Sequence, residues 1–114
     1  MQCTFSTDGD VLIASPAGRI DITTCNDFKI AIHANLDETK PKHLVIDLAA
    51  LEYLTSAGFR EFFLAGRRMG REGGTFSVCR LQPLVKELFE IAQFSTAYAV
   101  HETREAAVAA AKAA

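Results

Sequence analysis

The chain has 114 residues, 49% of them hydrophobic and 23% charged, and its formal net charge at pH 7 is −2. This length and this hydrophobic fraction predict a single folded domain over residues 1–114 and argue against disorder. The charge disfavours a general attraction to nucleic acid or anionic lipid, and no apolar run approaches the ~18 residues of a membrane span. The first residues lack the basic start and apolar stretch of a secretory signal. We therefore expect a soluble, cytoplasmic protein that binds no nucleic acid.

The cysteines indicate no disulfide and no metal site. Cys3, Cys25 and Cys79 are an odd number, lie far apart and form no CxxC pair. We interpret them as small buried hydrophobic side chains in a reducing compartment.

The N-terminal part is predicted to be a hairpin followed by an edge strand. Strand-like runs cover Gln2–Ser6 and Val11–Ala14, and Asp8-Gly9 between them is a strong hairpin signal. Arg19-Ile20 is expected to continue as an edge strand, because Pro16 disfavours a central position there.

A helix and a buried strand come next. Asp21 or Thr24 caps the helix, and Pro41 forbids its continuation. Its apolar stripe has a spacing of four residues and consists of Phe28, Ile32 and Leu36. The segment His43–Leu48 contains a continuous apolar run, which is typical of a strand covered on both faces. It leads through a short connection to Thr55.

A second helix is predicted from about Ser56 to Gly70. On a helical wheel, its core face carries Phe59, Phe62, Phe63, Gly66 and Met69. The opposite face carries Arg60, Glu61, Arg68 and Arg71. Leu64 falls in the middle of these charges, beside Ala57. An apolar centre with a polar rim is the anatomy of a binding patch, but single exposed leucines are also common, so both interpretations of Leu64 stay open.

The second half alternates strands and helices. Gly70–Gly74 is the turn before a strand at Thr75–Cys79, Pro83 opens a helix, Tyr98–Val100 is a short strand, and Thr103 caps the last helix. The buried stripe of the helix after Pro83 is expected to be Leu84, Leu88 and Ile91, with Val85 and Ala92. The whole pattern predicts an α/β fold with a mostly parallel central sheet and an N-terminal hairpin, flanked by about four helices.

No converging set of catalytic side chains is found in the sequence. His33, His43 and His101 lie in different elements, so no two of them are brought together by the sequence. Ser56 follows a strand and a turn, as a nucleophile elbow does, but its surroundings read T-S-A-G and not G-x-S-x-G. The chain also lacks a phosphate-cradling motif. We therefore expect neither an enzyme nor a protein with a cofactor or metal.

Ser56 has two compatible interpretations. As the helix N-cap, it would accept a hydrogen bond from an otherwise unpaired backbone N–H. As a phosphorylation site, it would place an anion where the N–H groups and the helix dipole favour one, so the modification would spare the fold. The added charge of roughly −1.5 to −2 would then act on the binding of a partner.

These residues resemble a known family. The run Leu44–Leu48 (LVIDL) and the later Tyr53–Phe59 (YLTSAGF) look like the signature of STAS domains, specifically of bacterial anti-sigma factor antagonists. Gly18–Asp21 resembles the early Gly-x-x-Asp turn of that family. Gly73-Gly74 before a strand, Pro83 and the final Ala-rich helix also fit. The resemblance covers nearly the whole chain and implies one STAS fold.

The resemblance also implies a function. Such proteins bind an anti-sigma factor that is at the same time a serine kinase with a GHKL-type ATPase fold, and binding releases the sigma factor. The kinase phosphorylates a serine at the start of the helix, and a serine phosphatase restores binding. The matching residue is Ser56, with Thr55 as an alternative acceptor. The implied partner surface comprises Asp21, Asn26, Thr55, Ser56, Ala57, Arg60, Leu64 and Arg68.

Three residues depart from the pattern of that family. Thr55 stands where an acidic residue is usual, Ala57 where a second serine is frequent, and Gln93 where a glycine ends the third helix. A glutamine there costs of order 1 kcal/mol if it adopts positive φ. The alternative function is that of a STAS adaptor subunit in a transport or sensory complex, which would dock by the same face without phosphorylation.

Overall fold

The computed structural model describes all residues from 1 to 114, and its main sheet is mostly parallel. The strands are β1 (Cys3–Asp8), β2 (Val11–Pro16), β3 (Gly18–Ile20), β4 (His43–Asp47), β5 (Leu51–Leu54), β6 (Thr75–Cys79) and β7 (Ala99–His101). Five of them form the sheet in the order β1-β2-β4-β6-β7, in which only β1 is antiparallel to its neighbour. Asp8 pairs with Val11 across the turn, and Gly9 there has a φ of +62°. The predicted hairpin and parallel sheet are confirmed.

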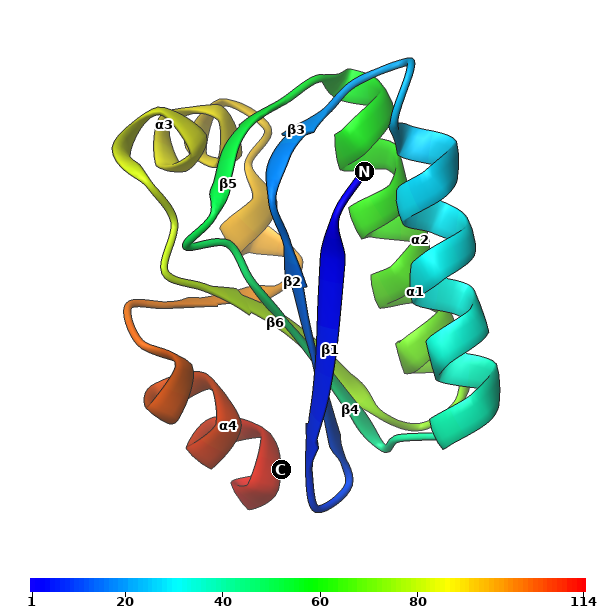
Figure 1. The fold of residues 1–114 in the computed structure, drawn as a ribbon. Coiled ribbons are helices and arrows are strands. Elements are labelled where there is room, and N and C mark those ends of the chain that lie inside the picture. The colour runs from blue at the N-terminus through cyan, green and yellow to red at the C-terminus, as the bar shows by residue number, and fades with distance from the viewer.

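Four helices cover the two faces and one end of this sheet. They are α1 (Cys25–Thr39), α2 (Ser56–Arg71), α3 (Pro83–Ile91) and α4 (Arg104–Ala113), and a short 3₁₀ turn, η1 (Phe94–Thr96), follows α3. In Figure 1, α1 and α2 lie side by side on one face and α4 lies on the other. Every residue of β4 is buried because it lies between these layers. The hydrophobic core therefore has two parts, a large one under α1 and α2 and a smaller one under α4.

A second, two-stranded sheet was not predicted from the sequence. β3 and β5 pair in parallel, with Arg19 opposite Tyr53 and Ile20 opposite Leu54. The sequence predicted an edge strand at Arg19-Ile20 but only a connection after Leu48. This small sheet matters because both strands end at the point where α1 and α2 begin.

The apolar stripe of α1 is confirmed, whereas that of α3 is wrong in part. Phe28, Ile32 and Leu36 are all buried. In α3 the buried residues are Val85 and Phe89, while the predicted core residues Leu84 and Ile91 are exposed. Phe89 takes the inward position because it contacts three aromatic rings, those of Phe59, Phe62 and Phe94, at centroid distances of 4.9, 5.8 and 4.7 Å.

The predicted first residue of α3 and the predicted cap of α4 are confirmed. Thr103 caps α4 by accepting a hydrogen bond from Ala106 N at 3.0 Å, and Pro83 is the first residue of α3. The three cysteines are free thiols; Cys79 is buried, and Cys3 and Cys25 are partly buried. None of the helices combines the length and the apolar character that crossing a bilayer requires.

Candidate functional site

The site predicted around Ser56 is built where the small β3–β5 sheet ends. The Thr55 N–H donates to Ile20 O at 3.0 Å, which ties the start of α2 to the loop before α1. The N-terminal ends of α1 and α2 consequently lie next to each other, at the top of Figure 1. Asp21, which follows Ile20, and Ser56, which follows Thr55, are thereby brought to the same end of the molecule.

Gly58 allows this close approach. A Cβ atom at Gly58 would lie 2.9 Å from Ile20 Cγ2, 3.1 Å from Ile20 O and 3.2 Å from Leu54 Cβ. At these distances Ile20 or the first turn of α2 would have to move. The glycine in the T-S-A-G segment is therefore explained by the packing of the first turn of α2 on β3, and not by an unusual φ.

Asp21 is held rigidly although it is near the surface. Its Oδ1 accepts hydrogen bonds from Thr23 N at 2.9 Å and from Thr23 Oγ1 at 2.6 Å. The Asp21 N–H in turn donates to Thr24 Oγ1 at 2.9 Å. The hydrogen bonds from the Thr23 side chain and backbone are the main reason why the pKa of Asp21 lies below its usual value. An ionised carboxylate with a fixed direction thus stands beside the two helix ends, near Arg19, whose Nε lies 3.8 Å from Asp21 Oδ2.

Ser56 is the first helical residue and not the N-cap, which corrects the sequence prediction. The N-cap position belongs to Thr55, whose side chain makes no capping hydrogen bond. The first intrahelical bond runs from Phe59 N to Thr55 O at 3.0 Å, so the N–H groups of Ser56, Ala57 and Gly58 precede it. The Ser56 side chain is exposed, whereas Thr55 is partly buried. Three backbone donors and an accessible hydroxyl therefore share one helix end.

The remaining predicted surface residues fall into two groups. Asn26 and Arg60 are exposed, and Ala57 is half-buried beside Ser56. Leu64, predicted to be exposed, is only partly so. The helical wheel distinguishes the core face of α2 from the opposite face, but it contains no information about neighbouring helices. In the structure α1 packs along α2, so less of the surface of α2 is exposed than the wheel predicts.

Arg68 is occupied by contacts within the chain. Its guanidinium donates to Asp37 Oδ1 at 2.5 Å and to Glu72 Oε2 at 3.0 Å. A third contact joins it to His33 Nδ1 at 3.0 Å. Burial and the neighbouring Arg68 charge lower the pKa of His33. Arg68 therefore ties α2 to α1, and its role as a partner contact remains a prediction.

Ile22 is an exposed residue that the sequence reasoning missed. Its side chain is 79% exposed although it lies between Asp21 and the start of α1. Ile30, on the second turn of α1, is also an exposed large hydrophobic residue. The sequence signal that could have revealed it is an isoleucine inside the otherwise polar loop Asp21–Thr24. With Ile22, the end of the molecule near Ser56 has an apolar contact group next to its charged and hydroxyl groups.

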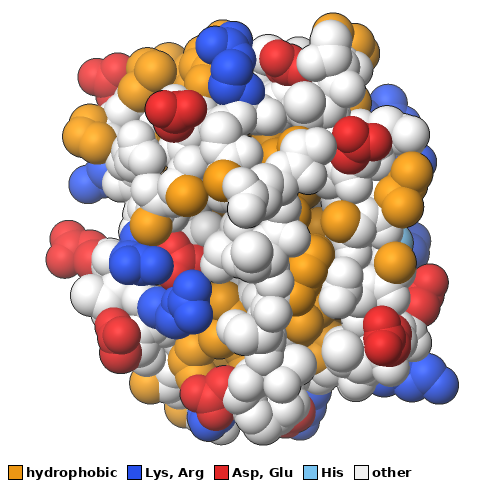
Figure 2. Space-filling view, in the orientation of Figure 1, with side chains coloured by type: hydrophobic (Ala, Val, Ile, Leu, Met, Phe, Trp, Pro, Cys, Tyr) orange, Lys and Arg blue, Asp and Glu red, His pale blue; other side chains and the backbone are white.

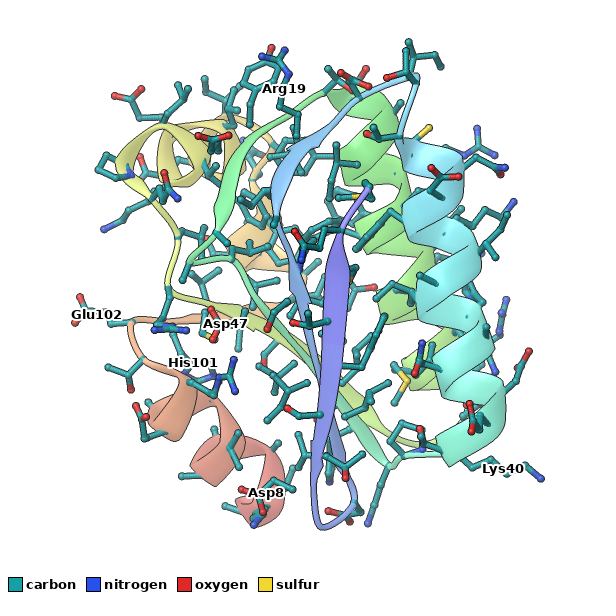
Figure 3. The ribbon with its side chains drawn as sticks, in the orientation of Figure 1. Asp8, Arg19, Lys40, Asp47, His101 and Glu102 are labelled. Atoms are coloured by element: carbon teal, nitrogen blue, oxygen red, sulfur yellow. The ribbon has the colours of Figure 1, made fainter.

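A second charged cluster lies away from this end. Asp47, at the end of β4, is 1% exposed and accepts hydrogen bonds from Arg80 Nη2 at 2.7 Å and Arg104 Nε at 2.8 Å. The Ala49 N–H donates to the same carboxylate at 3.1 Å. Burial alone would raise the pKa of Asp47, but these hydrogen bonds outweigh it and lower the pKa. The cluster connects β4, β6 and α4 (Figure 3).

Comparison with known proteins identifies the family. The sequence model of the STAS domain family matches residues 3–107 of this chain. The chain is 32% identical over 112 residues to a Bordetella bronchiseptica protein named as an anti-sigma factor antagonist, BtrV, and the match covers 98% of this chain and 96% of that protein. The chain therefore belongs to the STAS domain family, within the group of bacterial anti-sigma factor antagonists.

Solved structures agree with this assignment. An anti-sigma factor antagonist from Mycobacterium paratuberculosis superposes with a TM-score of 0.88 and 26% identity, over 97% of this chain and 93% of that one. The Bacillus cell-fate determinant SpoIIAA in its phosphorylated form superposes with a TM-score of 0.71 and 12% identity, over 94% of this chain and 96% of that one. The second likeness concerns the fold alone.

Proposed function

We propose that this protein is an anti-sigma factor antagonist whose binding is switched off by phosphorylation of Ser56. The partner would be an anti-sigma factor with a GHKL-type ATPase fold that also acts as the serine kinase, and a serine phosphatase would reverse the modification. The observation that carries the proposal is the exposed Ser56 hydroxyl at the first residue of α2, beside the fixed carboxylate of Asp21.

Ser56 suits phosphorylation better than Thr55. A kinase needs access to the hydroxyl, and Ser56 is exposed while Thr55 is partly buried. The Thr55 hydroxyl also points to Ile20 O, at 3.5 Å. Phosphorylation of Thr55 would therefore disturb the contact between β3 and α2, whereas a phosphate on Ser56 would extend into solvent.

The helix end can accept a phosphate without unfolding. No side chain caps α2, so its first N–H groups are free to donate to phosphate oxygens. Arg60 stands four residues after Ser56, on the same side of the helix, and is exposed. A phosphate on Ser56 is therefore expected to gain charge-assisted hydrogen bonds within the chain.

The same phosphate would weaken binding to the partner. It would lie at the same end of the molecule as Asp21 and the exposed Ile22, where it adds negative charge near an apolar side chain. Desolvating that charge, or opposing it to acidic groups of the partner, can cost several kcal/mol, and every ~1.4 kcal/mol is a tenfold change in affinity. The predicted contacts Asn26, Ala57, Arg60, Leu64 and Arg68 surround this position.

The test is a binding assay with an anti-sigma factor of the GHKL ATPase fold from the same organism. We expect Ser56→Asp to bind at least about 100-fold more weakly than the unmodified protein, and Ser56→Ala to bind but resist phosphorylation by the same kinase and ATP. Thr55→Ala is the matched control and should still be phosphorylated. Equal binding of Ser56→Asp, or a phosphate mapped by mass spectrometry only to another residue, contradicts the switch. Equal binding without any phosphorylation would favour the alternative, a STAS adaptor that docks by the same face.

A further inference from the structure

The strand β1 is an open edge of the main sheet. It is the first strand in the order β1-β2-β4-β6-β7, so only one of its sides is paired. In Figure 1 it is the strand at the front, and no other segment passes before it. The opposite edge, β7, has only three residues, and the Arg80 N–H donates to its His101 O. β1 has six residues and is the longer of the two edges.

The register of the hairpin shows which backbone groups of β1 point outward. The Ala17 N–H donates to Gln2 O at 2.9 Å, so Gln2 and Ala17 face each other as a hydrogen-bonded pair. Hydrogen-bonded and non-hydrogen-bonded pairs alternate along an antiparallel ladder. Residues 4, 6 and 8 therefore also point their N–H and C=O groups to β2. The N–H and C=O groups of Cys3, Phe5 and Thr7 point away from the sheet and have no partner.

Natural edges of this kind are usually protected, and β1 is not. Charged side chains, prolines and bulges are the common means of protection. The sequence from Cys3 to Thr7 has none of them, and its pairing with β2 is regular. Figure 2 shows this edge as a mostly white ridge with hydrophobic atoms in the furrows on either side.

We propose that β1 is the interface of a symmetric dimer, in which the β1 strands of two copies pair antiparallel and join the two sheets. Placing Phe5 opposite Phe5 of the second copy sets Cys3 opposite Thr7, and these are the residues whose outward N–H and C=O groups are free. Each pair then exchanges two backbone hydrogen bonds. Asp8 falls opposite Gln2, so the register brings no like charges together.

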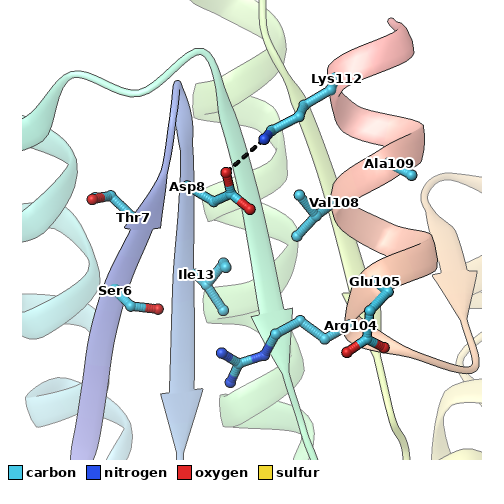
Figure 4. A pocket seen from close by; sticks show the side chains of 9 residues that line it. All are labelled: Ser6, Thr7, Asp8, Ile13, Arg104, Glu105, Val108, Ala109 and Lys112. Carbon is cyan, nitrogen blue, oxygen red and sulfur yellow. Dashed lines mark hydrogen bonds and ion pairs between the residues drawn. The ribbon is translucent and has the colours of Figure 1, made fainter.

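In this register, apolar side chains of one β1 strand lie on the same face as apolar side chains of the other. Cys3 and Phe5 are partly buried against the larger core on the α1 face. Ser6 and Asp8 face a hollow of about 560 Å³ between the hairpin and α4, where Lys112 Nζ binds Asp8 Oδ1 at 2.5 Å (Figure 4). Residues that oppose each other in antiparallel strands share a face. The dimer would therefore join apolar side to apolar side and leave the polar hollow hydrated.

Helix α1 leaves room for the second copy. The N-terminal ammonium of Met1, which precedes β1, lies 3.4 Å from Asp27 Oδ2, so Asp27 lies near the N-terminal end of β1. Ala31 and Ala34 follow on the same row, four and seven residues later. Small side chains there permit the α1 helices of two copies to approach across the two-fold axis.

The test uses the full chain. By light scattering and analytical ultracentrifugation we expect a dimer with a dissociation constant of about 10–100 µM, as suits a small interface. Thr7→Pro removes an outward N–H that has no partner in the monomer, so it should weaken the dimer at least about tenfold while circular dichroism stays unchanged. The matched control Thr7→Ala keeps the N–H and should dimerise like the parent.

Hydrogen exchange gives an independent readout. The amides of Cys3, Phe5 and Thr7 should gain protection as the protein concentration rises, and the amides of Thr4 and Ser6 should be protected at every concentration. A protein that stays monomeric at about 1 mM, or a dimer that Thr7→Pro leaves intact, overturns the proposal. Protection of these three amides only in the presence of a different protein also overturns it and assigns the edge to a foreign strand. Ser56→Asp should dimerise normally, so this test is independent of the phosphorylation switch.

Discussion

Asp21 and Asp47 show two opposite uses of one side chain. Both carboxylates have a lowered pKa, but the causes differ. Asp21 stands at the surface and is held by the hydroxyl and backbone N–H of Thr23. Asp47 is buried and is neutralised by Arg80 and Arg104. The first carboxylate is fixed in direction yet still offers its charge to solvent, while the charge of the second is used inside the protein.

This difference separates binding from stability. Hydrogen bonds from short local side chains orient a surface carboxylate without a partner from another layer. A buried carboxylate requires neutralisation and several hydrogen bonds, so its partners must come from distant segments. Changes at Asp21 should therefore affect partner binding, and changes at Asp47 should affect the free energy of unfolding.

The largest effect is expected for Asp47→Asn. The substitution keeps the shape of the side chain but removes the charge that pairs with Arg80 and Arg104, so we expect a loss of about 3 kcal/mol in the free energy of unfolding. Urea unfolding followed by circular dichroism measures it. The matched control Asp21→Asn should change stability by less than about 1 kcal/mol but weaken binding to the anti-sigma factor about tenfold or more. Equal losses of stability in the two variants would contradict the separation.

The pH dependence of stability should also depend on Asp47. Its pKa is lower in the folded protein than that of an ordinary aspartate, so the ionised carboxylate stabilises the fold at pH values above the pKa of the unfolded chain. This contribution is lost as the pH falls through the folded-state pKa. The parent protein should therefore lose stability more steeply than Asp47→Asn between about pH 5 and pH 2, and the two should converge at the acid end. Parallel curves would show that Asp47 does not control the acid response.

An intermediate effect is expected for Gly58→Ala, which should affect both stability and partner binding. The new Cβ would lie 2.9 Å from Ile20 Cγ2 and 3.1 Å from Ile20 O, so Ile20 or α2 must move, and Ile20 directly precedes Asp21. We expect a loss of about 1–3 kcal/mol in stability, together with weaker partner binding. Gly70→Ala is the matched control in the same helix, because no atom lies within 4 Å of its Cβ position. That variant should be neutral or slightly stabilising in thermal unfolding. A neutral Gly58→Ala would mean that the approach of α2 to β3 is not tight.

The sequence predicted those elements whose signal is local. The spacing of Phe28, Ile32 and Leu36 gave the buried face of α1 correctly, because that helix has one apolar row. In α3 two apolar rows lie side by side, and only contact with distant aromatic rings selects Val85 and Phe89 over Leu84 and Ile91. Periodicity alone cannot make that choice.

The sequence predicted the serine at the start of α2, but it did not predict which residues from other segments lie near that serine. The T-S-A-G segment identified the hydroxyl at the start of α2. The pairing of β3 with β5, which brings Asp21 to it, joins two very short strands that lie far apart in the chain. The contacts of Arg68 with Asp37 and His33 likewise depend on how α1 packs against α2. Such contacts between distant residues leave no regular pattern in one sequence.

The smallest effect is expected for Gln93→Gly, between α3 and η1. Gln93 adopts a φ of +54°, at the position where the family pattern has a glycine, and a residue with a Cβ pays about 1 kcal/mol for that conformation. Glycine removes this strain but gains freedom in the unfolded chain, so we expect a net stabilisation of at most about 1 kcal/mol, a rise of a few degrees in Tm. Arg80 also has a positive φ, +56°, but its guanidinium binds Asp47. Arg80→Gly should therefore destabilise the protein despite the same relief of strain. If both glycine variants raised the Tm, the Asp47 cluster would contribute less to stability than its buried carboxylate and two arginine partners indicate.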